Sequence, residues 1–104
     1  MKNSNTVLEE SNDQELVQLV KQGYKLAFAE IERRYYHRLY QTALVILDDR
    51  YEAKKITEAS LQQACKTIKG FKNECLLLTW LCRIQISKAN QRRCEILQQQ
   101  AGEE

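Results

Sequence analysis

Hydrophobic residues recur at steps of three and four along most of the chain, a spacing that predicts helices with one buried face. The clearest stripe predicts one long helix, and its members are Ala27, Phe28, Ile31, Tyr35, Leu39, Ala43 and Ile46. The pattern returns over residues 52–69, where the inward positions are Ala53, Ile56, Ala59 or Ser60, Ala64 and Ile68. Asp48, Asp49 and Arg50 interrupt the two stripes and predict a turn between two helices.

A shorter helix is predicted before the long one. Residues 16–20 form a small apolar face, and Ser11 and Asn12 just before it are natural helix N-caps. Gly23 is suited to end this helix in the left-handed conformation. Residues 1–10 show no periodicity and predict a mobile leader.

The last predicted helix covers residues 76–93 and changes character along its length. Its first half is apolar and contains Trp80, the only tryptophan, whereas its second half is polar and basic. Gly70 closes the preceding helix, and residues 98–104 are expected to be a tail. The sequence therefore predicts an all-α domain over residues 11–97, a small bundle of three long helices and one short N-terminal helix.

Composition supports this fold, and the charge distribution adds a functional hint. The 104 residues include no proline and only three glycines. The net charge is +2, but the first fifteen residues hold four acidic groups and one lysine. Residues 50–93 hold ten lysines or arginines against three acidic residues. A basic half behind an acidic leader indicates an anionic partner.

Several protein classes are not favoured by the sequence. It has no membrane-length apolar run and no signal-peptide pattern, so we expect a cytoplasmic protein without membrane contact. Cys65, Cys75, Cys82 and Cys94 contain no CxxC pair and lie far from the lone His37, which predicts reduced thiols rather than a metal site.

Catalytic chemistry has no sequence signal either. There is no glycine-rich phosphate loop and no recognisable nucleophile or metal-hydrolase motif, so we predict a non-enzyme without a cofactor. His37 is expected to be an exposed or capping histidine. Glu30 with Arg34, and Asp49 with Lys54, are expected to be ordinary surface charge pairs.

Three motifs occur together at compatible spacings: GxxxAF at residues 23–28, RRY at 33–35 and TWLxRI at 79–84. With them, residues 13–93 resemble region 2 of bacterial RNA polymerase sigma factors, in particular the extracytoplasmic-function group. The other positions that fit the family pattern are Leu16, Val17, Val20, Ile31, Leu39, Tyr40, Ala43, Leu47, Asp49, Ala53 and Phe71.

The resemblance implies that the last helix and the loop before it engage the promoter −10 element and help to melt it. The implied DNA-binding residues are Lys72, Asn73, Arg83, Ser87, Lys88, Asn90, Gln91 and Arg92. Their side chains suit contacts with phosphates and base edges, and the loop would receive an unstacked base. Arg83 has an alternative role, which is to brace the bundle through an internal ion pair. Ser87 stands where the family usually has asparagine.

The resemblance also implies that the third predicted helix, over residues 52–69, docks on the clamp helices of the polymerase's largest subunit. The implied polymerase-binding residues are Arg34, Arg38, Lys54, Lys55, Glu58, Leu61 and Gln62. Lys54 and Lys55 replace an acidic pair of the family, and this reversal of charge opposes docking on a basic surface. Tyr24 replaces an aspartate after Gly23, which we expect to change only a helix cap.

Two functions are therefore open. The chain is either a sigma-factor-like transcription initiation module that binds core RNA polymerase and the −10 element, or a degenerate sigma-fold module that binds a regulator such as an anti-sigma factor without initiating transcription. A plain basic nucleic-acid binder is a third possibility. Typical members continue into region 4, which we expect to be lacking here, so a working module would be a fragment or have a separate region-4 subunit as partner.

Overall fold

The computed structural model describes residues 4–102, and side chains from Val7 onward. Within that range every regular element is helical: α1 (Ser4–Glu10), α2 (Asp13–Lys21), α3 (Lys25–Leu47), α4 (Arg50–Thr67), the 3-10 turn η1 (Ile68–Gly70) and α5 (Leu77–Gly102). The predicted all-α fold is confirmed, and so are its three long helices.

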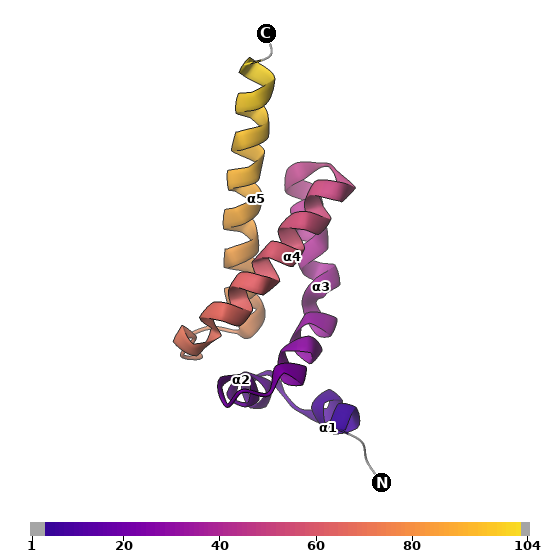
Figure 1. Cartoon of the computed structure of the whole chain (residues 1–104), viewed down its shortest axis with the longest axis vertical. Coiled ribbons are helices and arrows are strands. Elements are labelled where there is room, and N and C mark those ends of the chain that lie inside the picture. The colour runs from indigo at the N-terminus through magenta and orange to yellow at the C-terminus, as the bar shows by residue number, and fades with distance from the viewer. Residues whose placement is uncertain (1–3, 103–104) are drawn as a thin grey trace.

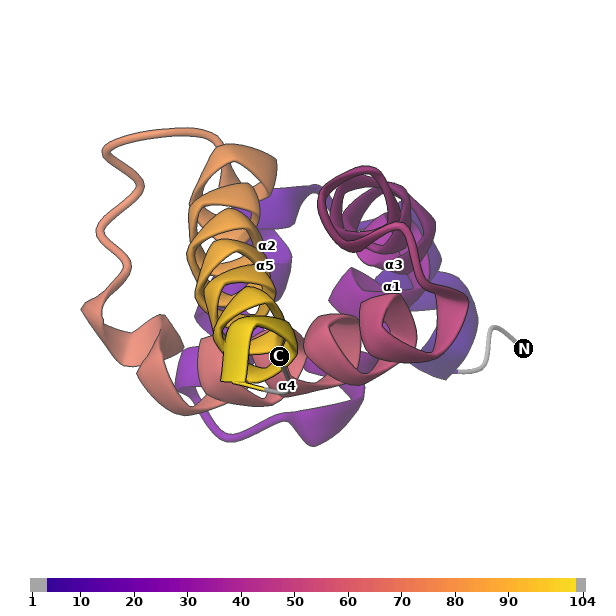
Figure 2. The same ribbon diagram turned by 90° about the horizontal axis from the view of Figure 1, so that it is seen from above.

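Helices α3, α4 and α5 form the body of the bundle (Figure 1). Seen from above, α3 and α5 lie beside each other and α4 packs against both (Figure 2). Helices α1 and α2 lie at one end of the body, whereas the last turns of α5 extend past the other end (Figure 1). The α5 helix is thus anchored in the bundle over most of its length, and only its last turns project from it (Figure 1).

The buried side chains form one large cluster and one small one. The large cluster joins residues of α2, α3, α4 and α5, and its bulky members are Leu16, Val17, Phe28, Ile31, Leu39, Leu61, Ile68, Phe71, Leu77 and Leu81. The small cluster consists of Ala43, Ala53 and Ala89, one from each long helix. Alanine at all three positions leaves room for the three backbones to approach one another closely. The predicted inward stripe of α3 is confirmed in the buried Phe28 and Ile31.

One fully buried polar side chain ties the three long helices together. Gln85 of α5 is 0% exposed, and its Nε2 donates to the backbone oxygen of Leu39 in α3 (2.6 Å) and to Oγ1 of Thr57 in α4 (2.8 Å). Buried amides are costly unless they are hydrogen-bonded. This pairing therefore favours one register of the three helices.

The helix ends follow the local signals in the sequence. Oδ1 of Asn12 accepts a hydrogen bond from the backbone nitrogen of Glu15 (2.8 Å) and caps α2. Gly23 has a φ of +101°, so the predicted left-handed glycine is confirmed. Asp49 caps α4 by accepting from the backbone nitrogen of Glu52 (2.9 Å). Tyr24 is the N-cap of α3 and makes no side-chain capping bond, as expected from the loss of an aspartate there.

Both ends of the chain are more helical than the sequence pattern predicted. The sequence pattern predicts a mobile leader that includes residues 4–10, but these residues form α1. Leu8 of this helix packs against the large cluster. Residues 98–102, taken as tail, continue α5. The predicted 1–10 leader and 98–104 tail also include residues 1–3 and 103–104, which lie outside the described range.

Candidate polymerase and nucleic-acid interface

An open groove on the exposed face of α5 gathers four of the predicted DNA-binding residues. Arg83, Ser87, Lys88 and Gln91 line it together with Trp80 and Ile84 of the same helix and Gln63 of α4. Steps of three and four residues place these α5 positions on one side of the helix. We call this groove the α5 groove. It combines two cations, a hydroxyl and two amides with an aromatic ring and an isoleucine.

Arg83 and Arg92 differ in the contacts that they make within the chain. Arg83 is exposed and makes no ion pair within residues 4–102, so the alternative that it braces the bundle is not supported. Arg92 instead braces it: its Nε and Nη2 donate to the two carboxylate oxygens of Glu52 at 2.8 and 3.0 Å. Nη1 of Arg92 also donates to Glu95 (3.2 Å).

The Arg92–Glu52 pair connects α5 to the first turn of α4 and is largely shielded. The Arg92 side chain is 26% exposed and that of Glu52 14%. The hydrogen bonds from Arg92 lower the pKa of the Glu52 carboxyl, although burial acts in the other direction. The guanidinium of Arg92 is directed at Glu52 and braces the bundle, and Arg92 does not lie among the groove residues, so its contact with DNA stays a prediction.

The loop between η1 and α5 is held at both ends and exposed between them. Phe71 and Leu77 are buried, and Nζ of Lys21 donates to the backbone oxygen of Phe71 (2.6 Å). Lys72 and Asn73 are exposed in this loop. Asn73 has a φ of +57°, a left-handed conformation that asparagine tolerates better than most residues.

The base of this loop is fastened to α5 by an aromatic contact. The rings of Phe71 and Trp80 have centroids 5.0 Å apart at an angle of 32°, within the range of favourable aromatic pairs. The contact links the loop of Lys72 and Asn73 to the α5 groove through Trp80. Asn90, also predicted to bind DNA, is exposed further along α5 but does not line the groove.

The predicted polymerase-binding residues of α4 form an exposed stripe with one exception. Lys54, Lys55, Glu58 and Gln62 are all exposed, and we call them the α4 stripe. Nζ of Lys55 lies 5.1 Å from the centre of the Tyr51 ring, a cation–π contact on the same surface. Leu61 is only 4% exposed and belongs to the large core cluster. Its assignment to a polymerase contact is therefore corrected to a packing role.

Arg38 of α3 lies apart from the α4 stripe. It lines a separate groove between α3 and α5 with Val45, Leu78 and Cys82. The structure therefore does not bring Arg38 together with Lys54 and the rest of the stripe.

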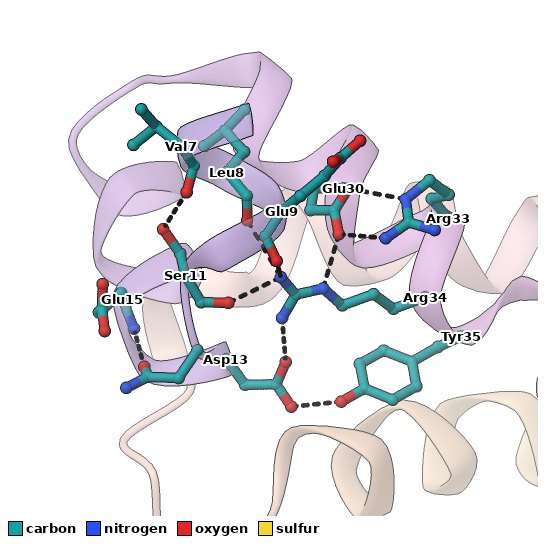
Figure 3. Close-up of polar contacts among 11 residues, drawn as sticks. Val7, Leu8, Glu9, Ser11, Asp13, Glu15, Glu30, Arg33, Arg34 and Tyr35 are labelled. Carbon is teal, nitrogen blue, oxygen red and sulfur yellow. Dashed lines mark hydrogen bonds and ion pairs between the residues drawn. The ribbon is translucent and has the colours of Figure 1, made fainter. Parts of the chain in front are cut away.

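Arg34, the other α3 residue predicted to bind polymerase, is committed to contacts inside the chain (Figure 3). Its Nε donates to Glu30 (2.7 Å) and its Nη1 to Asp13 (3.3 Å). Its Nη2 lies within hydrogen-bond distance of three backbone oxygens, those of Leu8 (3.0 Å), Glu9 (3.1 Å) and Ser11 (2.7 Å). The side chain is 19% exposed and anchors the end of α1, and its contact with polymerase stays a prediction.

Glu30 is the buried centre of this arginine cluster. It is only 7% exposed, and it accepts hydrogen bonds from Nε and Nη2 of Arg33, both at 2.8 Å, as well as from Arg34. The bonds from Arg33, helped by Arg34, lower the pKa of Glu30 to about 2 against the effect of burial. The expectation of an ordinary surface pair between Glu30 and Arg34 was wrong.

Asp13 receives a second partner from the same helix face. The hydroxyl of Tyr35 donates to Oδ2 of Asp13 (Figure 3). Burial, together with this hydrogen bond, raises the pKa of Tyr35 to about 12. Arg34 and Tyr35 therefore hold the first residue of α2 jointly.

The groups considered for catalysis or metal binding are dispersed. His37 is exposed and pairs with the side chain of Gln41 (3.0 Å). The four cysteines are free, with Cys65 and Cys94 exposed. Within residues 4–102 no three histidine, cysteine or acidic side chains are grouped so as to hold a metal ion. None of the described helices combines the length and the apolar character that crossing a membrane requires.

The all-α bundle is consistent with the sigma region 2-like fold that the motifs predicted. Comparison with curated proteins agrees with this class. The chain is similar to the RNA polymerase sigma-H factor of Pseudomonas aeruginosa, with 29% identity over 83 residues, 80% of this chain and 43% of that protein. It is also similar to the ECF RNA polymerase sigma-E factor of Haemophilus influenzae, with 32% identity over 81 residues, 78% of this chain and 42% of that protein.

The similarity to sigma factors, expected from the motifs, is thus confirmed over about four fifths of the chain. The chain spans less than half the length of these two relatives. No family model matches the chain, and no solved structure matches it.

Proposed function

We propose that this domain is a sigma-factor-like transcription initiation module that binds core RNA polymerase and the promoter −10 element in the cytoplasm. The observation that carries the proposal is the α5 groove, which Arg83, Ser87, Lys88 and Gln91 line together with Trp80. Cations that hold phosphates beside an aromatic ring and polar side chains are the usual elements of single-strand recognition.

The loop before α5 supports the same assignment. Lys72 and Asn73 project from a loop whose base is fastened to Trp80 through Phe71. A strand that follows the α5 groove would reach this loop next, and an unstacked base could contact Asn73. Extrusion of a base costs a few kcal/mol, which the contacts of loop and groove together would offset.

Docking on polymerase is assigned to the α4 stripe. Lys54, Lys55, Glu58 and Gln62 are exposed on one surface that shares no residue with the α5 groove.

The first experiment measures binding of the purified protein to core RNA polymerase, with an established sigma factor as competitor. Saturable binding that the competitor displaces is the expected result. The complex is then tested on a fork-junction DNA with a single-stranded −10 segment. Arg83→Ala with Lys88→Ala is expected to weaken DNA binding about tenfold or more, because two phosphate contacts are lost.

A matched control separates groove contacts from general charge. Lys66→Ala with Lys69→Ala also removes two positive charges, but from exposed positions outside the α5 groove and the α4 stripe. This variant is expected to bind DNA nearly as well as the original protein. An equal loss in both double variants would mean that DNA senses only the net charge, which contradicts the groove assignment.

A second function is favoured by one specific observation. Lys54 and Lys55 are exposed on the α4 stripe, with Glu58 as its single acidic member. This charge suits an acidic surface and opposes a basic one. The second candidate is therefore a sigma-fold module that binds a regulator, such as an anti-sigma factor, without initiating transcription. Absence of displaceable binding to core polymerase at micromolar concentrations would decide for it.

A further inference from the structure

A separate cleft lies where the turn between α2 and α3 meets the end of α4. Its floor is apolar and includes Val20, Phe28 and Ile68, and its rim carries Lys25, Lys66 and Lys69. The cleft has a volume of about 400 Å³. We call it the lysine cleft. Its residues play no part in the proposed function, and it shares none of them with the α5 groove or the α4 stripe.

The charge around the lysine cleft is strongly one-sided. The three lysines face one acidic lining residue, Glu32, and burial raises the pKa of its carboxyl. In the part of the chain that the structure describes, Lys25, Lys66 and Lys69 make neither an ion pair nor a hydrogen bond. Their charges are therefore available to an external anion.

The floor of the cleft adds a second requirement on the ligand. Phe28 and Ile68 close the bottom of the cleft and belong to the buried large cluster, whereas Val20, Tyr24 and Ala29 give it exposed apolar surface. An apolar group from outside would cover this surface and remove it from water. The volume corresponds to one or two large side chains, which is small for a complete interface and suitable for an anchor.

We propose that the lysine cleft docks an acidic protein segment that inserts one or two large apolar side chains between the three lysines. The apolar floor supplies the anchor position, and the rim supplies attraction for flanking carboxylates. A nucleic-acid backbone would satisfy the lysines but leave the floor uncovered, so the acidic segment fits both features better.

The test uses three short synthetic peptides and NMR titration of the full chain up to millimolar concentrations. The first peptide is rich in glutamate with one central phenylalanine, the second has alanine in place of phenylalanine, and the third has lysine in place of glutamate. The expected result is that only the first shifts the amide signals of Gly23, Phe28 and Ile68 saturably.

Charge-reversed variants locate the attraction. Lys66→Glu with Lys69→Glu is expected to weaken binding of the first peptide about tenfold, since several exposed charge contacts become repulsive. Lys54→Glu with Lys55→Glu makes the same charge change on the α4 stripe and is expected to leave the affinity within about twofold. All four lysines are exposed, and circular dichroism verifies that both variants remain folded.

Four outcomes would overturn the proposal. Equal affinity of the phenylalanine and alanine peptides would show that no apolar side chain anchors the segment. Equal weakening of peptide binding by the two charge-reversed variants would show that only the net charge of the protein matters. Stronger shifts of the same signals by a single-stranded oligonucleotide would assign the cleft to nucleic acid. Saturable shifts by dodecanoate without any by the peptides would assign it to small acidic amphiphiles. None of these results bears on polymerase binding, so the proposed initiation function is tested independently.

Discussion

The buried carboxylate of Glu30 should make the stability of this domain depend on pH in a defined way. Its pKa falls from 4.5 to about 2 in the folded chain because Arg33 and Arg34 donate hydrogen bonds to it. A shift of this size corresponds to about 3 kcal/mol of stability at neutral pH. Arg33 is 64% exposed and its contribution is screened by water, so we expect about 2 kcal/mol.

The direction of the pH dependence follows from the sign of the shift. Because the folded pKa is lower than the unfolded one, the stabilisation is complete above about pH 5 and is lost as the pH falls toward 2. The change Glu30→Gln removes the ionisable group. Its loss of stability should be about 2 kcal/mol at pH 7 and less than about half of that at pH 3.

Urea unfolding followed by circular dichroism measures this difference at a series of pH values. Other carboxylates affect the original protein and the variant alike, so their effects cancel in the difference. Glu58→Gln is the matched control, since Glu58 is exposed on α4, and it should change stability by less than about 0.5 kcal/mol. If the stability difference between the original protein and the Glu30→Gln variant stays constant from neutral to strongly acidic pH, the role assigned to the charge is refuted.

Four further changes have expected outcomes. Tyr24→Asp should supply the missing cap of α3 and raise the free energy of unfolding by about 1 kcal/mol, and a loss would show that the N-cap assignment is wrong. Gln85→Ala should cost about 2 kcal/mol in urea unfolding because it removes hydrogen bonds to two helices and leaves a cavity. Arg92→Met should lower the urea midpoint of unfolding and speed amide exchange in the second half of α5, whereas unchanged exchange would contradict the bracing role. Lys54→Glu with Lys55→Asp should strengthen core-polymerase binding in the competition assay if the α4 stripe is the docking surface; unchanged or weaker binding would remove that assignment.

Short-range features of the fold could be predicted from the sequence because their signals lie within one helix or one turn. The α3 stripe from Ala27, the cap at Asn12 and the left-handed Gly23 are all of this kind. The groove positions Arg83 and Ser87 also follow from helical periodicity once the helix is known. These predictions require no knowledge of how distant segments meet.

The internal contacts of two predicted site residues join distant segments of the chain. Arg34 is 26 residues from Leu8, and Arg92 is 40 residues from Glu52. Three partners of Arg34 are backbone oxygens, which leave no mark in the residue types. Leu61 is different, because it lies on the same helical face as Ala53 and Ala64 and its burial could have been inferred from periodicity.

The arrangement around Arg34 also gives a structural reason for the RRY motif at residues 33–35. An arginine has donors on three nitrogens, and here all three are used, so a lysine could not replace it. Tyr35, the next residue of the pattern, meets the same Asp13. These positions should consequently vary together among homologous chains, as a set imposed by architecture. Chains of this fold would retain them whatever partner they bind, whereas a change of partner would alter the exposed residues of the α5 groove first.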